Sequence, residues 1–108
     1  MPNLNHPLIK KLRCLNLSSE DYAVFGSGPL YAHGIRDISH DLDVVARGAA
    51  WDKLSQMSPP QKARIGNVLV IELDRGEMEF FSGWAWGDWT ADELIDSADI
   101  IDGIRFVA

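Results

Sequence analysis

Two stretches of this chain give the main signals for its fold: YAVFGSG at residues 22–28 and DLDVVA at residues 41–46. Each contains a short apolar run of the kind that forms a buried strand. The first run leads straight into a glycine-serine turn at residues 26–28. The second carries Asp41 and Asp43 at alternate positions. Both carboxylates therefore point to one face of the predicted strand, while Leu42 and Val44 point to the other.

The turn and the aspartate pair together indicate phosphate chemistry. A glycine-serine turn that opens a helix can hold phosphate oxygens on its backbone N–H groups. Two carboxylates on one face of a strand can share a divalent cation. A phosphate cradle beside a metal clamp is what phosphoryl or nucleotidyl transfer requires. The structural alternatives are a plain helix N-cap at Ser27 and two solvated aspartates at the end of a strand.

The remaining elements follow outward from these two strands. An apolar stripe at helical spacing and Pro7 predict a helix that begins at residue 7, and residues 90–93 form a capping box. A hairpin turn at residues 74–76, with Gly76 at positive φ, joins two strands, and another turn lies at residues 102–103. The predicted helices lie near residues 7–15, 29–34 and 51–57 and after residue 90, and the strands at 22–25, 41–46, 67–73 and 77–81.

This order of elements predicts an α/β (α+β) fold. Its sheet is mixed, with about four to five strands flanked by short helices, because a hairpin must add an antiparallel pair. The chain has 108 residues, of which 46% are hydrophobic, so we expect a single domain over residues 1–108.

Composition narrows the function classes. The net charge of −6 makes a nucleic-acid partner unlikely, since neutralising phosphates needs clustered lysine and arginine. Cys14 is the single cysteine, which excludes an intrachain disulfide. The sequence has no stretch like a signal peptide and no run of membrane-spanning length, so we expect a cytoplasmic protein without a membrane partner.

The pattern of strand, Gly-Ser, short helix and Asp-hydrophobic-Asp-hydrophobic resembles the nucleotidyltransferase superfamily, which has a polymerase-β-like fold. The likeness is nearest to its minimal bacterial members and covers about residues 22–84. In the family, a third carboxylate lies between hydrophobic residues on a later strand. Glu79 and Glu72 both fit this position. Glu79 is preferred because the run EFFSGW that it begins looks like the strand end of certain small members.

The resemblance implies roles for particular residues. Asp41, Asp43 and the third carboxylate would be catalytic and would hold Mg²⁺ or Mn²⁺ on the triphosphate of a nucleotide. Gly26 and Ser27 would bind the phosphates. Arg36, always charged and in the loop before the aspartates, is a further phosphate-binding candidate. The expected reaction transfers a nucleotidyl group from a nucleoside triphosphate, with ATP as the default donor. The acceptor would be a hydroxyl of a protein, such as a partner toxin, or of a small molecule, such as an antibiotic.

Two other functions stay open. One is a nucleotide-binding or regulatory module, antitoxin-like, that keeps the fold but has no transfer activity. It is favoured by the sequence ending at Ala108, about where larger relatives carry a further helical segment that helps bind the base or the acceptor. The other is a glycosyltransferase that uses Asp41 and Asp43 to bind a nucleotide sugar.

Overall fold

The computed structural model describes residues 6–26, 41–64, 68–83 and 89–107. The described part contains three α-helices, one 3₁₀ turn and seven strands. In chain order they are α1 (Pro7–Cys14), β1 (Tyr22–Phe25), β2 (Leu42–Ala46), α3 (Gly48–Met57), β3 (Gln61–Lys62), β4 (Leu69–Leu73), η1 (Asp74–Gly76), β5 (Met78–Phe81), α4 (Ala91–Asp96), β6 (Asp99–Ile101) and β7 (Ile104–Phe106). The helix expected at residues 29–34 lies outside the described residues.

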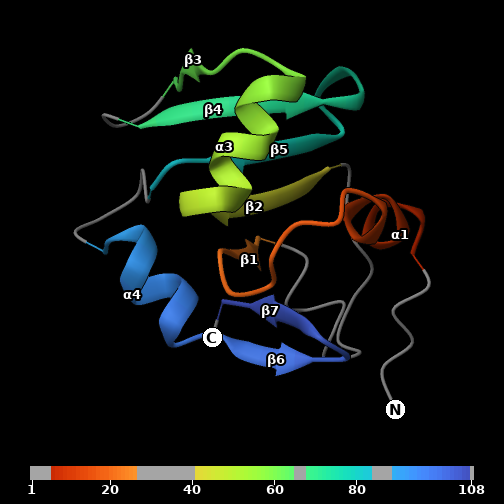
Figure 1. Ribbon diagram of the computed structural model, residues 1–108, viewed down its shortest axis with the longest axis vertical. Helices are drawn as coiled ribbons and strands as arrows, with labels where there is room; N and C mark the ends of the chain where they lie inside the picture. Colours follow the sequence, from red (N-terminus) through yellow and green to blue (C-terminus); the bar gives the residue numbers. More distant parts are fainter. Residues whose placement is uncertain (1–5, 27–40, 65–67, 84–88, 108) are drawn as a thin grey trace.

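All seven strands form one sheet, in the order β3-β4-β5-β2-β1-β7-β6 (Figure 1). The sheet is mixed, as predicted: β1 runs antiparallel to β2, whereas β2 runs parallel to β5. The expected number of four to five strands is wrong. The additional strands β3, β6 and β7 contain only two or three residues each. Strands this short are too brief for an alternating pattern to be recognised.

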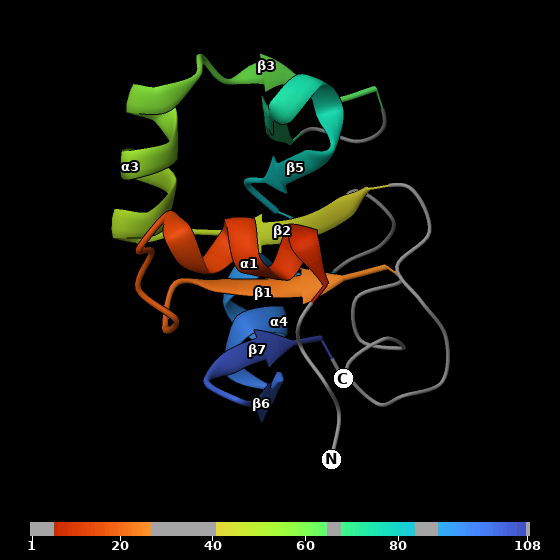
Figure 2. The same ribbon diagram turned by 90° about the vertical axis from the view of Figure 1, so that its right-hand side faces the viewer.

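The two faces of the sheet are covered differently. Leu42 and Val44 join the larger core cluster, to which α1 contributes Leu8, Ile9 and Leu12 and α3 contributes Leu54. Figure 2 shows α1 lying along β1 and β2 on this side. Val45 points the other way, into a smaller cluster with Leu94 and Ile95 of α4. The alternation predicted for residues 42–45 is therefore confirmed, and the aspartates share the face of the smaller cluster.

Local signals for the helix ends are also confirmed. The Nδ1 atom of His6 accepts a hydrogen bond from the backbone N–H of Leu8, which caps α1 ahead of Pro7. Thr90 and Glu93 form the predicted capping box of α4. No described helix is long and apolar enough to cross a membrane.

The hairpin between β4 and β5 is confirmed, with its turn at Asp74–Gly76 as predicted. Gly76 has φ +88°, as predicted, but Asp74 and Arg75 also have positive φ values of +53° and +59°. Three successive left-handed residues reverse the chain within a single 3₁₀ turn. The turn sets the register in which Glu72 of β4 lies opposite Glu79 of β5.

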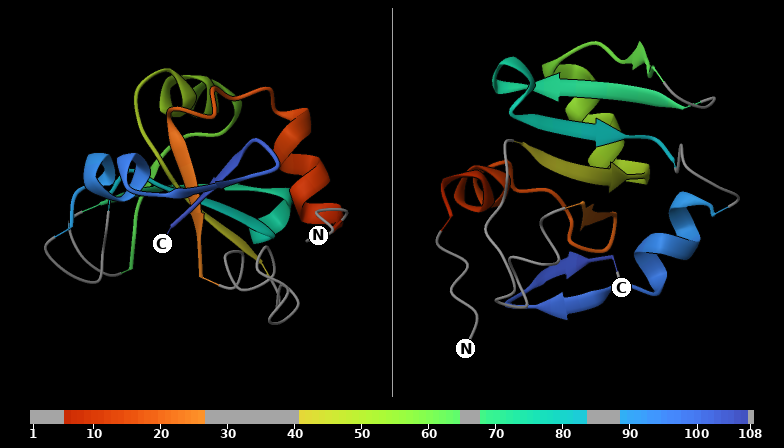
Figure 3. Two further views of the ribbon diagram at one scale, coloured as in Figure 1. Left: turned by 90° about the horizontal axis from the view of Figure 1, so that it is seen from below. Right: turned by 180° about the vertical axis from the view of Figure 1, so that it is seen from behind.

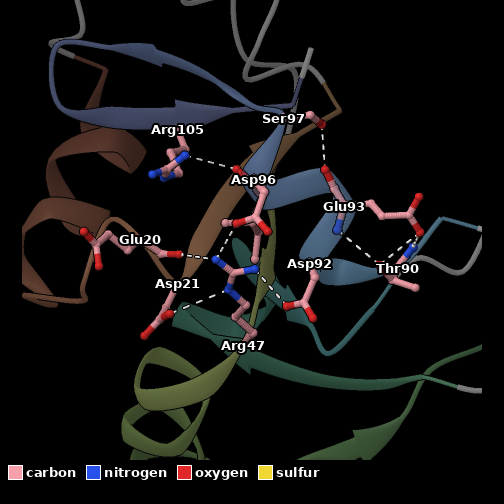
Figure 4. Close-up of polar contacts among 10 residues, drawn as sticks. Glu20, Asp21, Arg47, Thr90, Asp92, Glu93, Asp96, Ser97 and Arg105 are labelled. Carbon is pink, nitrogen blue, oxygen red and sulfur yellow. Dashed lines mark hydrogen bonds and ion pairs between the residues drawn. The ribbon is translucent and has the colours of Figure 1, made fainter.

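Arg47 fastens α4 to the rest of the fold. It follows β2 directly, and its guanidinium contacts Asp92 and Asp96 of α4 at 2.8 Å each (Figure 4). It also donates to the backbone carbonyl of Glu20 at 2.8 Å and lies 3.7 Å from Asp21, just before β1. One side chain thus joins α4 to the entry of β1 and the exit of β2.

Candidate functional site

The pairing of β2 with β5 brings the predicted carboxylates together. Asp43 of β2 lies opposite Glu79 of β5 in a parallel register. Asp41 precedes Asp43 by two residues and so shares its face. One carboxylate oxygen from each of Asp41, Asp43 and Glu79 lies within 4.8 Å of the other two. The three side chains, which we call the acidic triad, are all half-buried.

This geometry and donor set suit a hard divalent cation. Such ions bind carboxylate oxygens at about 2.0–2.6 Å, so two oxygens on one ion lie up to about 4–5 Å apart. The oxygens of the acidic triad lie within that range. Asp41, Asp43 and Glu79 are therefore the residues that could hold Mg²⁺ or Mn²⁺.

Electrostatics within the triad favour a bound cation. Burial and the neighbouring Asp41 carboxylate raise the pKa of Asp43 to about 6. Burial, a hydrogen bond with Asp41 and the charges of Asp43, Asp41 and Glu72 raise the pKa of Glu79 to about 7. Like charges held together in a half-buried place repel each other, and either a proton or a metal ion relieves that repulsion.

Gly26, which follows β1, lies directly against Asp43 of the triad. Gly26 has φ +72°, a conformation that favours glycine. A Cβ atom on Gly26 would lie 2.9 Å from Oδ2 of Asp43, closer than real Cβ contacts allow. The start of the predicted phosphate-binding turn is therefore beside the carboxylates. Ser27 and Arg36, the other predicted nucleotide-binding residues, lie outside the described residues.

The two candidates for the third carboxylate are now distinguished by position. Glu79 belongs to the triad, next to β2. Glu72 is one strand further away on β4, opposite Glu79, and is exposed. The negative charge of Glu72 helps to raise the pKa of Glu79, but Glu72 is not a member of the triad.

A cavity of about 560 Å³ adjoins the triad and was not predicted from the sequence. Glu72 and Glu79 line it together with Arg64 and Arg75. Nothing in the local sequence pattern around these arginines distinguishes them from ordinary surface residues. Their shared position depends on the pairing of β3, β4 and β5.

Comparisons with known proteins give no relative for this chain. No protein-family model matches it, and searches of curated proteins and of solved structures find no significant match.

Proposed function

We propose that this protein is a Mg²⁺-dependent nucleotidyltransferase that moves a nucleotidyl group from a nucleoside triphosphate to a hydroxyl group. The observation that carries the proposal is the convergence of Asp41, Asp43 and Glu79 beside Gly26. These residues come from three separate strands or strand ends, and the sequence pattern had assigned the same residues to metal and phosphate binding.

Each group has a distinct task in this proposal. Asp41 and Asp43 would hold the cation that accompanies the triphosphate. A bound Mg²⁺ or Mn²⁺ would neutralise phosphate charge and make the α-phosphorus more electrophilic. Gly26 lets the backbone turn close to Asp43, and Ser27 and Arg36 follow as phosphate-binding residues. Glu79 completes the ligand set on the side away from the turn.

The transfer itself is an in-line displacement. The acceptor hydroxyl oxygen forms a bond to the α-phosphorus, and its proton passes to the Glu79 carboxylate. The bond between the α-phosphorus and the oxygen bridging to the β-phosphate breaks. Pyrophosphate leaves with that electron pair, so charge and atoms balance. ATP is the proposed donor.

Ligand-linked stability tests the nucleotide site. Mg²⁺ with ATP should raise the melting temperature more than either does alone, because the metal joins two anionic partners. Saturation to a hundredfold over Kd corresponds to about 2.7 kcal/mol of added stability. Asp43→Asn should abolish this shift. The matched control is Asp52→Asn, since Asp52 is an exposed residue of α3 away from the triad, and it should leave the shift intact.

Label transfer tests the chemistry. The protein is incubated with Mg²⁺ and ATP labelled at the α-phosphate, together with cell lysate separated into protein and small-molecule fractions. Transfer that requires Asp43 supports the proposal. Binding of Mg²⁺–ATP without transfer to either fraction would instead favour the nucleotide-binding or regulatory module. Absence of any shift with several nucleotides at millimolar concentration would exclude both functions.

A further inference from the structure

The cavity beside Glu79 lies on the open part of the sheet. Its floor is the face of β4 and β5 that carries Val70, Glu72, Glu79 and Phe81. Viewed from behind, none of the helices in the described part of the chain lies over β4 and β5 on this side (Figure 3, right). Residues 61–64, and Arg75 and Gly76 of the hairpin turn, complete the lining. The volume of about 560 Å³ is in the range of sites for small molecules.

The two arginines of this cavity have no charge partner among the described residues. Every other described arginine is engaged: Arg13 with Asp102, Arg47 with the carboxylates of α4, and Arg105 with backbone carbonyls. Arg64 and Arg75 form neither an ion pair nor a side-chain hydrogen bond within the described part of the chain. Glu72 and Glu79 line the same cavity, which therefore carries charges of both signs, and the two guanidinium groups without described carboxylate partners are the groups in it that can bind an anion.

Lys62 of β3 also lines the cavity, so the cationic residues of the cavity are Lys62, Arg64 and Arg75.

The cavity and the Gly26 turn lie on opposite sides of the acidic triad. At one level of the sheet, residues of β1, β2, β5 and β4 follow one another in register: Phe25, Asp43, Glu79 and Glu72. Gly26 follows Phe25 at one end of this row, and the cavity includes Glu79 and Glu72 at the other. In an in-line displacement the attacking group enters opposite the leaving group. If the triphosphate binds at Gly26, the acceptor therefore enters from the opposite side, where the cavity lies.

From this arrangement we propose that the cavity binds the acceptor, and that the acceptor is a small hydroxyl compound carrying a phosphate or carboxylate group. The proposal rests on the proposed nucleotidyl transfer. Arg64, beyond the start of β4, or Arg75, in the turn at the end of β4, holds the anionic group by charge-assisted hydrogen bonds. Val70 and Phe81 support the apolar body, and the hydroxyl faces Glu79. This oxygen becomes bonded to the α-phosphorus as pyrophosphate departs, and its proton passes to the Glu79 carboxylate.

Binding of defined probes tests the proposal. Binding is measured by calorimetry in the presence of Mg²⁺ and a non-hydrolysable ATP analogue. Each anionic probe is compared with a neutral twin: 4-hydroxyphenylacetate with 4-hydroxyphenylacetamide, and glycerol 3-phosphate with glycerol. The carboxylate and phosphate pairs distinguish the two possible anions. The variant is Arg64→Gln with Arg75→Gln. The charge-matched control is Lys10→Gln with Lys53→Gln, because neither lysine lines the cavity.

We expect at least one anionic probe to bind, its neutral twin to bind about tenfold more weakly or not at all, and the arginine variant to lose a similar factor. The lysine variant should bind like the wild type. Both arginines are exposed, so an unchanged melting temperature checks that the variant is folded.

Each contrary result overturns a different statement. If Mg²⁺–ATP raises the melting temperature but no anionic probe binds, or the arginine variant binds the probes as before, the acceptor assignment is wrong while the nucleotide site stands. If the arginine variant instead weakens Mg²⁺–ATP binding, the arginines hold the donor. If label from ATP enters only protein, the acceptor is not a small molecule. If Mg²⁺–ATP has no effect at all, the proposed function itself fails.

Discussion

Gly26 and Asp43 lie side by side across the β1–β2 pair, so a side chain on Gly26 would require the Asp43 carboxylate to shift. The hydrogen of glycine faces Oδ2 of Asp43 where a Cβ atom would lie at 2.9 Å. The same residue has a left-handed backbone. Gly26 is therefore required twice, once for its conformation and once for the space beside the carboxylate.

Gly26→Ala should destabilise the protein more than the same substitution at another glycine that has a left-handed backbone. A left-handed alanine costs about 1–2 kcal/mol, and the clash with Asp43 adds to this cost. Gly103→Ala is the matched control, since Gly103 has φ +80° and nothing within 4 Å of a Cβ. We expect Gly26→Ala to be the more destabilising in urea unfolding and to weaken Mg²⁺ binding, which Gly103→Ala leaves unchanged. Equal costs and equal metal binding would mean that the Asp43 contact relaxes freely.

The metal-free protein should lose stability as pH rises. The pKa values of Asp43 and Glu79 are raised to about 6 and about 7. Between about pH 4 and 7 the folded protein therefore holds more protons than the unfolded chain, and the free energy of unfolding falls across this window. We expect a loss on the order of 1 kcal/mol, allowing for solvent screening. Unfolding of the wild type and of Asp43→Asn/Glu79→Gln, measured at each pH, isolates the effect, because the variant lacks it.

Mg²⁺ should reverse this dependence. The ion binds the ionised carboxylates, so its stabilisation should be large at pH 8 and small at pH 5, where protons compete. Melting temperatures with and without Mg²⁺ at the two pH values measure it. A stabilisation that is equal at pH 5 and pH 8 would mean that the ion binds elsewhere.

Asp43→Asn should be neutral or stabilising in metal-free buffer near pH 7. It removes one charge from a crowded acidic triad while nearly preserving shape, which favours the folded state by about 1 kcal/mol. The same substitution should abolish stabilisation by Mg²⁺–nucleotide. Clear destabilisation without metal, together with an intact metal response, would identify Asp43 as a structural hydrogen-bonding residue.

Glu79→Gln and Glu72→Gln should behave differently. Glu79 belongs to the triad, so its substitution should abolish the metal response. Glu72 is exposed on the neighbouring strand, and its substitution should leave metal binding within about threefold of wild type. Isothermal titration with Mn²⁺ measures both. The reverse order of effects would assign the third carboxylate to Glu72.

Arg47→Met should destabilise the fold far more than Arg13→Met. The side chain of Arg47 is 24% exposed. It forms ion pairs with two carboxylates of α4 and donates a hydrogen bond to a backbone carbonyl. Its loss should cost about 2 kcal/mol. Arg13 has an exposed pairing with Asp102, worth about 1 kcal/mol or less. Urea unfolding of the two variants compares them, and similar small costs would show that α4 is held by its apolar face alone.

Local chemistry was enough to predict most elements. The strands at residues 22–25 and 42–46, the helix after Pro7, the hairpin with Gly76 and the capping box at Thr90 all depend on residues close together in the chain. The facing of Asp41 and Asp43 to one side is likewise a property of a single strand, because side chains alternate with a period of two. These features can be predicted without knowledge of the tertiary contacts.

Other features depend on distant pairing. Strand β7 is held against β1 through Val24 and Phe106, 82 residues apart, and its three residues are too few for their alternation to predict a strand. The ion pair between Arg47 and Asp96 of α4 likewise joins distant residues and was not predicted from the sequence.

The local sequence pattern predicts candidates for a metal and phosphate site: the turn that starts at Gly26 and the carboxylates Asp41 and Asp43. It leaves Glu79 and Glu72 as alternatives, because both are acidic residues flanked by hydrophobic ones on predicted strands. Their distances from Asp43 differ because of strand pairing, since the parallel register of β2 and β5 places Glu79 opposite Asp43. The cavity with Arg64 and Arg75 is also a tertiary feature. It exists because three strands and a turn pack side by side, and no local pattern encodes that packing.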